Sequence, residues 1–218
     1  MAENDLLASC SFIQELAEPT QQIMLQYCRL KRVKKGEILY YENDEIDKIY
    51  FLVTGRIKSY KVTRFDNEIF LFEQKTSGLI TCFSIYEEKN RYFSNVESVI
   101  DALVCVMDMS VLRDQLARHK PLETFFARQL ATKVETLTSV ITRDMVFDST
   151  AKVAHMIEHK LCEFNAYKKQ DVAYMLNIQP ETLSRILKKI KRDGIIDTDP
   201  NGNVVVLDHK SLIEIYEL

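Results

Sequence analysis

The chain has 218 residues, of which 46% are hydrophobic and 28% charged, with five glycines and four prolines. This composition excludes collagen-like, low-complexity and wholly disordered proteins, and the length suits one large domain or two modest ones. The 29 Lys and Arg against 32 Asp and Glu give a formal charge of −3, so any nucleic-acid contact has to come from a local basic patch.

Location and cysteine chemistry follow from two simple observations. No apolar run approaches the ~18 residues that a membrane span needs, and residues 1–5 are acidic where a secretory signal is basic. We therefore expect a cytoplasmic chain with no membrane partner. The five cysteines, at 10, 28, 82, 105 and 162, include no C-x-x-C pair. We expect thiols rather than a disulfide framework, and no metal site.

The first thirty residues show helical periodicity, whereas residues 33–107 consist of short β-branched and aromatic runs separated by turn signals. Six strands are predicted, at 38–41, 49–53, 57–62, 69–72, 93–99 and 103–107. No crossover helix separates them. This pattern predicts a small antiparallel barrel or sandwich and argues against a parallel α/β sheet.

A long helix is predicted next. The two dozen residues that follow Pro121 contain neither Gly nor Pro, and their apolar positions recur at steps of three and four, close to a coiled-coil seam. The seam consists of Phe126, Leu130, Val134, Leu137, Ile141 and Met145. We expect it to be a dimer interface; the alternative is an amphipathic helix packed on its own barrel.

The last third of the chain predicts a winged helix. Asp148-Ser149-Thr150 caps a helix that runs to about Cys162. Residues 169–176 and 180–192 form two helices joined by a three-residue turn, and a hairpin with Asn201-Gly202 at its turn follows. The expected fold class is α+β, with an antiparallel β domain and flanking helices at 1–120, a dimerisation helix at 121–147 and a winged helix at 148–218.

The second helix of this unit carries a local positive charge. Between Gln179 and Arg192 there are five cations and one acid, Glu181, and the apolar side chains share one side of the helix. The candidate DNA-binding residues are Lys169, Gln179, Glu181, Thr182, Ser184, Arg185, Lys188 and Lys189. A solvated helix face is the alternative, but the preceding helix-turn and the following wing favour DNA.

The run Glu181-Thr182-Leu183-Ser184-Arg185-Ile186-Leu187 resembles the recognition helix of the Crp/Fnr family of bacterial transcription regulators. The resemblance extends over essentially the whole chain. It implies a cyclic-nucleotide-binding-like β-roll, a homodimer, a palindromic double-stranded DNA operator and a contact with RNA polymerase. The resemblance thus implies that the first domain is a β-roll sensor and that the last binds DNA.

The resemblance also implies how the operator is read. Arg in the place of Arg185 reads a guanine in the family, and Glu in the place of Glu181 takes the base-pair partner. This agrees with chemistry, because Arg donates two hydrogen bonds to guanine O6 and N7 whereas Glu accepts from the cytosine N4 amine. Ser184 is typical of the Fnr branch. The E-x-x-S-R pattern implies a half-site close to TTGA, hence an inverted repeat like TTGA-N6-TCAA.

The sensory half departs from the nucleotide-binding members of this family. Those members hold the ribose with a Gly-Glu pair and the phosphate with an Arg-Ser/Thr-Ala run. Here Thr81-Cys82 and Tyr92-Phe93 stand at those positions, and Arg91 is one residue out of place, which in a strand moves it to the other face. Cyclic AMP is therefore not the expected effector. The candidate effector pocket consists of Thr81, Cys82, Phe83, Arg91, Tyr92 and Phe93.

Other cofactors are constrained less sharply. Cys10 and Cys28 do not reproduce the N-terminal spacing of the iron–sulfur ligands of Fnr, so no cluster is expected, while haem held by Cys or Met stays open. The effector classes left are redox, nitric oxide or haem, and a small apolar ligand. Cys82 is a candidate sensor through oxidation or haem ligation, with Arg91 as the sequence-local cation that would favour its thiolate. A small buried hydrophobe is the alternative for this residue.

Neither catalysis nor a DNA-independent role is favoured. Cys82 has no His base anywhere in residues 33–107, and His155 and His159 lack the Glu that follows the first His in H-E-x-x-H, so we predict no catalytic residue. The alternative function is a cyclic-nucleotide-binding regulatory module without a DNA role. The winged helix and the altered cassette both argue against it.

Overall fold

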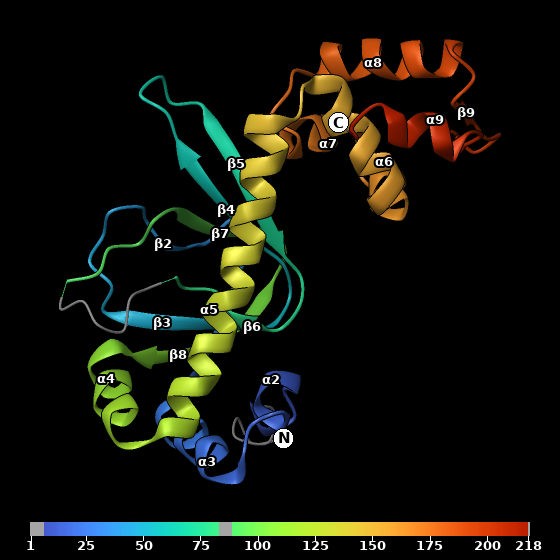
Figure 1. Ribbon diagram of the computed structural model, residues 1–218. Helices are drawn as coiled ribbons and strands as arrows, with labels where there is room; N and C mark the ends of the chain where they lie inside the picture. Colours follow the sequence, from blue (N-terminus) through green and yellow to red (C-terminus); the bar gives the residue numbers. More distant parts are fainter. Residues whose placement is uncertain (1–6, 83–88, 218) are drawn as a thin grey trace. The chain divides into compact units, whose positions relative to one another are not determined.

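The computed structural model describes residues 7–82 and 89–217, and the chain divides into two compact units, residues 1–136 and 137–218, which are described separately (Figure 1). The first unit contains α2 (Ser11–Gln14), α3 (Glu18–Tyr27), β1 (Arg29–Val33), β2 (Ile38–Tyr40), β3 (Lys48–Thr54), β4 (Ile57–Val62), β5 (Glu68–Gln74), β6 (Gly78–Leu79), β7 (Asn95–Ser98), β8 (Ala102–Asp108), α4 (Met109–Arg118) and most of α5 (Lys120–Ile141).

Two four-stranded sheets make up the roll of the first unit. Their strand orders are β1-β8-β3-β6 and β2-β7-β4-β5, and every pairing is antiparallel. The core of this unit is apolar: Phe51 of β3 is fully buried, Phe12 of α2 stacks on it with ring centroids 5.1 Å apart, and Phe126 of α5 meets it edge-on at 5.7 Å. Burying each such ring stabilises the unit by about 1.5–3 kcal/mol.

All six predicted strands are present and antiparallel, but two strands were not predicted. β1 was not predicted because its sequence is mostly charged, so it shows no apolar pattern. Of its five residues only Val33 is buried. β1 is a strand because it pairs with β8, from Arg29 opposite Val106 to Val33 opposite Ala102. β6 has only two residues, too few to show an alternation.

The long helix is present as α5, but it ends earlier than predicted. After Ile141 the chain makes one π-helical turn, η1 (Thr142–Val146), in which the Phe147 amide donates to the Thr142 carbonyl at 3.1 Å. The prediction for Phe126 as a dimer-seam residue is wrong in this fold, because its ring is fully buried against the roll of its own chain. A side chain enclosed in its own core is not available to a partner.

The second unit begins inside α5 and continues with α6 (Ser149–Ala166), α7 (Lys169–Met175), α8 (Pro180–Arg192), β9 (Ile196–Thr198), β10 (Val204–Val206) and α9 (His209–Glu214). The Asp148 side chain caps α6 as predicted, accepting from the Thr150 and Ala151 amides at 2.8 Å each. The wing turn is held by Asp199, which accepts from the Asn201 and Asn203 amides.

In the helix-turn-helix, α8 has the predicted bounds, and α7 ends at Met175, one residue earlier than predicted. Between α7 and α8, Asn177 adopts a left-handed backbone with φ of 52°, a conformation that Asn tolerates better than most residues. Pro180 then opens α8 at a position where no amide donor is needed. The short helix α9 was not predicted, and Leu212 anchors it in the core. None of the helices among the described residues is long and apolar enough to cross a membrane.

Candidate functional site

The outer face of α8 is the strongest candidate site. Four apolar residues on one side of this helix are buried in the core of the second unit: Leu183, Ile186, Leu187 and Ile190. The opposite side exposes Glu181, Arg185 and Lys188, which follow one another at steps of four and three and therefore share a face. Ser184 is exposed beside them, and Thr182 is half-buried at the flank.

The charges on α8 divide into paired and unpaired groups. Lys191 forms an ion pair with Asp197 of the wing, and Arg192 lies 3.4 Å from the carboxylate of Asp193. Within the part of the chain that the structure describes, Arg185 and Lys188 have no ion-pair or hydrogen-bond partner. The unpaired charge thus lies on the face opposite the core, where a ligand can reach it.

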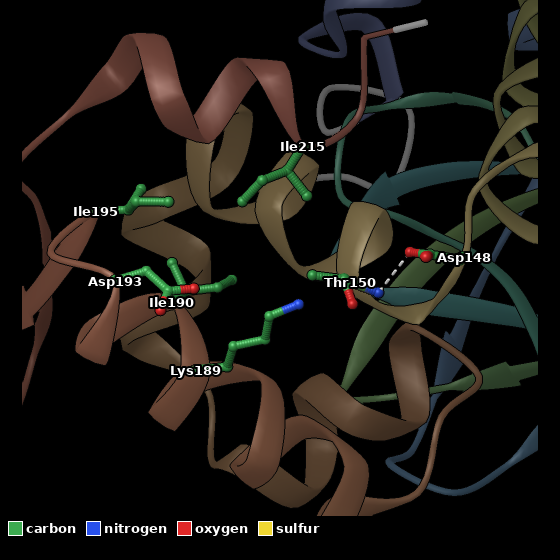
Figure 2. A pocket seen from close by; sticks show the side chains of 7 residues that line it. All are labelled: Asp148, Thr150, Lys189, Ile190, Asp193, Ile195 and Ile215. Atoms are coloured by element: carbon green, nitrogen blue, oxygen red, sulfur yellow. Dashed lines mark hydrogen bonds between the residues drawn. The ribbon is translucent and has the colours of Figure 1, made fainter.

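Lys189 takes a different direction. It lines a cavity of about 260 Å³ within the second unit, with Asp148, Thr150, Ile190, Asp193, Ile195 and Ile215. Figure 2 shows its side chain directed toward Thr150, beside the hydrogen bond from the Thr150 amide to Asp148 at the start of α6. Lys189 therefore flanks the outer face of α8 and does not lie at its centre.

The two remaining predicted DNA contacts lie at helix starts. Lys169 is the first residue of α7 and is exposed. Gln179 holds the N-cap position of α8 and its side chain makes no capping bond to the described residues, which leaves its amide group at the surface. The poor capping capacity of Gln at this position is thus visible in the structure.

Two residues of the predicted effector pocket are buried in the core of the first unit. Thr81 is fully buried and its hydroxyl accepts from the Tyr50 amide at 3.1 Å. Tyr92 is buried too: its ring stacks on Tyr40 with centroids 3.8 Å apart, and its hydroxyl donates to the Lys48 carbonyl at 2.9 Å. These contacts make Thr81 and Tyr92 parts of the core.

The other predicted pocket residues are placed differently. Cys82 and Phe93 are half-buried, whereas Phe83 lies outside the described residues. Arg91 is exposed, and its guanidinium donates to the carbonyl of Asn43. The structure therefore does not place this cation in the interior beside Cys82, as the sequence-local hypothesis required.

A buried cation that sequence reasoning missed lies beside Cys82. Lys133 of α5 exposes only 7% of its surface; its ammonium donates to Gln74 Oε1 and lies 5.2 Å from the centroid of the Phe72 ring. Burial lowers the pKa of Lys133 to about 8, and the neighbouring Cys82 acts in the opposite direction. Nothing in the sequence indicates that Lys133 is buried, because it is one of many polar residues along α5 and most of the others are exposed.

Burial also controls the thiols. It raises the pKa of Cys82, and the nearby Lys133 only partly opposes the rise, so Cys82 is a neutral thiol at pH 7. Cys105 is fully buried and its pKa is raised by burial and further by Cys28 and Cys10, which lie close to it in the core. Among the described residues, no group of three or more His, Cys, Asp or Glu side chains is arranged to hold a metal ion.

Comparisons with known proteins agree with this architecture. A family model of the cyclic nucleotide-binding domain matches residues 30–119, and a model of the Crp-like helix-turn-helix domain matches residues 153–215. The first match covers the two sheets, and the second covers the helix-turn-helix with its wing.

Relatives with known roles match over most of the chain. The anaerobic regulatory protein of Haemophilus influenzae is 20% identical over 198 residues, which is 86% of this chain and 76% of that protein. The fumarate and nitrate reduction regulatory protein of Vibrio cholerae is also 20% identical over 198 residues, covering 86% and 78%. The structure of FixK2 from Bradyrhizobium japonicum has the same fold, with a TM-score of 0.67 and 16% identity over 88% of this chain and 98% of that one.

The two family models match the chain in the order of the fold, the first over the antiparallel roll and the second over the winged helix-turn-helix that follows the long helix. The relatives from Haemophilus influenzae and Vibrio cholerae are both named as regulatory proteins. The fold class and the family predicted from residues 181–187 are confirmed. The chain belongs to the Crp/Fnr family of transcription regulators.

Proposed function

We propose that this regulator binds, as a homodimer, a palindromic DNA operator with TTGA-like half-sites, and that α8 is the recognition helix. One observation carries the proposal: Glu181, Arg185 and Lys188 share the outer face of α8 with no partner among the described residues, while Lys191 and Arg192 are paired with nearby acids. Exposed polar groups that make no contact within the protein are available to hydrogen-bond a ligand that has its own donors and acceptors.

The roles of these side chains follow from their chemistry. Arg185 offers two donors to guanine O6 and N7, and Glu181, one turn earlier, accepts from the N4 amine of cytosine. Ser184 lies beside them on the exposed surface. Lysine acts as a point charge, so Lys188 and the flanking Lys189 are assigned to phosphates.

The helix starts complete the proposed DNA contacts. Lys169 and Gln179 are exposed at the beginnings of α7 and α8, and Thr182 is half-buried at the flank of α8. Side chains and amides at helix N-termini commonly bind phosphate, because the helix dipole is positive there. We assign these three residues to the DNA backbone.

A dimer is proposed because a palindrome needs two readers about one helical turn apart. The exposed apolar residues Val134, Ile141 and Met145 lie on one stripe of α5 and η1, with 62%, 55% and 81% of their surface exposed. Leu130 and Leu137 are half-buried on the same stripe. Covering such a stripe with a second copy would remove a large apolar surface from water.

The effector is proposed to be something other than cyclic AMP. The exposed Arg91 and the core position of Tyr92 leave the described part of this segment without the bidentate donor that a cyclic phosphate needs. We retain three effector classes: a redox signal, nitric oxide or haem, and a small apolar ligand. A contact with RNA polymerase is proposed on family grounds alone.

The test of DNA reading is a pair of alanine variants. Fluorescence anisotropy would measure the binding of the full-length protein to a TTGA-N6-TCAA duplex and to a duplex with both guanine pairs replaced. Arg185→Ala should lose about tenfold or more of the discrimination per half-site, because a bidentate Arg–guanine contact contributes about 1–3 kcal/mol.

Lys188→Ala is the matched control, since it removes a cation from the same face of the same helix. It should weaken both duplexes alike and lessen the dependence of affinity on salt. Equal loss of discrimination in the two variants would contradict the assignment of Arg185 to the base.

A further inference from the structure

One carboxylate joins the π turn after α5 to the turn of the helix-turn-helix. Asp144 lies in η1; its Oδ1 is 3.0 Å from Lys152 Nζ in α6, and its Oδ2 accepts from Asn177 Nδ2 at 3.2 Å. Lys152 Nζ also lies 3.4 Å from the carbonyl oxygen of Leu176, at the end of α7. We refer to Asp144, Lys152 and Asn177 as the polar latch.

The latch is sheltered from solvent. Lys152 exposes 9% of its surface, and the Asp144 side chain exposes 21%. Burial raises the pKa of Asp144, but hydrogen bonds from Arg143 and Lys152 outweigh it, so the pKa lies below its usual value. Removing the carboxylate would leave the Lys152 ammonium buried without its counter-ion, which is strongly unfavourable.

The local backbone explains why these groups meet. The π turn inserts extra backbone between α5 and the Asp148 cap of α6, and such turns are frequent at functional sites. On the other side, the left-handed Asn177 places its amide group toward Asp144, while the Asn177 backbone amide donates to the Tyr174 carbonyl at 3.0 Å. The latch therefore holds the segment from which α8 starts three residues later.

We propose that the polar latch fixes the recognition helix to the end of α5, so that a dimer reads two half-sites at one spacing only. The proposal rests on the proposed function, because it assumes two copies joined along α5 and DNA read by α8. The latch residues would contact no base and no phosphate; they are positioning residues. Rotation at the π turn would otherwise let α8 take several orientations on the DNA.

The test varies the operator spacing. Anisotropy titrations with the full-length protein would use duplexes in which TTGA and TCAA are separated by four to eight base pairs. Each added pair rotates a half-site by about 35°, so the wild type should lose about tenfold in affinity one pair away from its optimum. Asp144→Asn should flatten this profile to less than about threefold, because it loses the ion pair that sets the orientation.

A second variant guards against general misfolding. Asn177→Gly keeps the left-handed backbone available and removes only the amide group, so it should flatten the spacing profile as well. The matched control is Asp148→Asn, the same change four residues later. Within the described part of the chain, the Asp148 side chain accepts hydrogen bonds from the Thr150 and Ala151 amides at the start of α6. Its loss therefore weakens a helix cap and should leave the spacing profile steep.

The outcomes separate the latch from the proposed function. Steep profiles in Asp144→Asn and Asn177→Gly, or an equally flat profile in Asp148→Asn, would overturn the latch. If the wild type binds none of these duplexes, the operator assignment fails instead. Hydrogen exchange without DNA then decides the latch: Asp144→Asn should speed exchange in residues 142–147 and 176–179 together, and unchanged protection there would overturn it.

Discussion

Lys133 places an ammonium group inside the first unit, where burial opposes its charge. Among the described residues, its ammonium donates to the amide oxygen of Gln74 and lies over the face of Phe72. An amide oxygen and an aromatic face only partly replace the water that the ammonium loses. The charge is therefore present at a cost in stability, and that cost changes with pH.

The sign of this pH dependence can be derived. The pKa of Lys133 is lowered from 10.5 to about 8 in the folded chain, so between these values the unfolded chain holds a proton that the folded chain has released. The free energy of unfolding should therefore rise with pH through this window, by up to about 3 kcal/mol in total. Urea unfolding followed by circular dichroism at several pH values measures it.

Lys133→Met should lack this rise, because no group titrates at the position. Lys120→Met is the control: Lys120 begins the same helix but is exposed, so its removal should leave the wild-type profile intact. Parallel pH profiles in the wild type and in Lys133→Met would show that Lys133 keeps an ordinary pKa.

At the scale of elements, α5 presents apolar residues to two different surroundings along its length. Its first turns bury Leu122 and Phe126 in the core of the roll. Farther along, the helix exposes Val134 and Ile141. One amphipathic pattern in the sequence thus corresponds to an internal contact at the start of the helix and to the proposed dimer contact beyond it.

Leu137→Glu tests the dimer contact. In a parallel dimer the two carboxylates would face each other across the two-fold axis, where like charge and lost solvation both oppose association. We expect the dimer to weaken at least about a hundredfold, with sedimentation showing monomer at micromolar concentration and loss of operator binding.

Ser139→Glu is the matched control for this prediction, because Ser139 is exposed roughly opposite the seam on the same helix. It should remain dimeric. A Leu137→Glu protein that sediments as a dimer would place the interface elsewhere in the chain.

At the scale of the whole molecule, the charge is distributed unevenly. The chain carries −3 in total, yet residues 179–192 hold five cations and one acid. A net negative protein with one basic helix should bind DNA at defined sites and repel it elsewhere, which favours specificity over general affinity. Among the described residues of the first unit, Lys133 is the one buried cation.

Cyclic AMP should therefore neither bind nor alter operator affinity. Calorimetry with the full-length protein should show a dissociation constant above about 1 mM. A phosphate that lacks a bidentate partner loses its hydration and gains no hydrogen bonds that replace it. An absorption spectrum of the same sample would reveal a haem or cluster if one is carried. Micromolar binding of cyclic AMP would contradict the inference that neither Arg91 nor Tyr92 can bind its phosphate.

The sequence alone determined the features that depend on neighbouring residues. The bounds of α8, the Asp148 cap and the wing turn were predictable because caps, turns and amphipathic faces are set within a few positions along the chain. The family and its candidate reading residues, Glu181 and Arg185, follow from that local pattern.

Tertiary structure alone decided the features that join distant segments. β1 is a strand because β8 pairs with it, and Lys133 is buried because β5 covers it with Gln74 and Phe72. Asp144 meets Asn177 only when η1 packs against the turn before α8. Such contacts depend on long-range packing and burial, which no spacing along the chain encodes, so these residues gain their roles only in the folded protein.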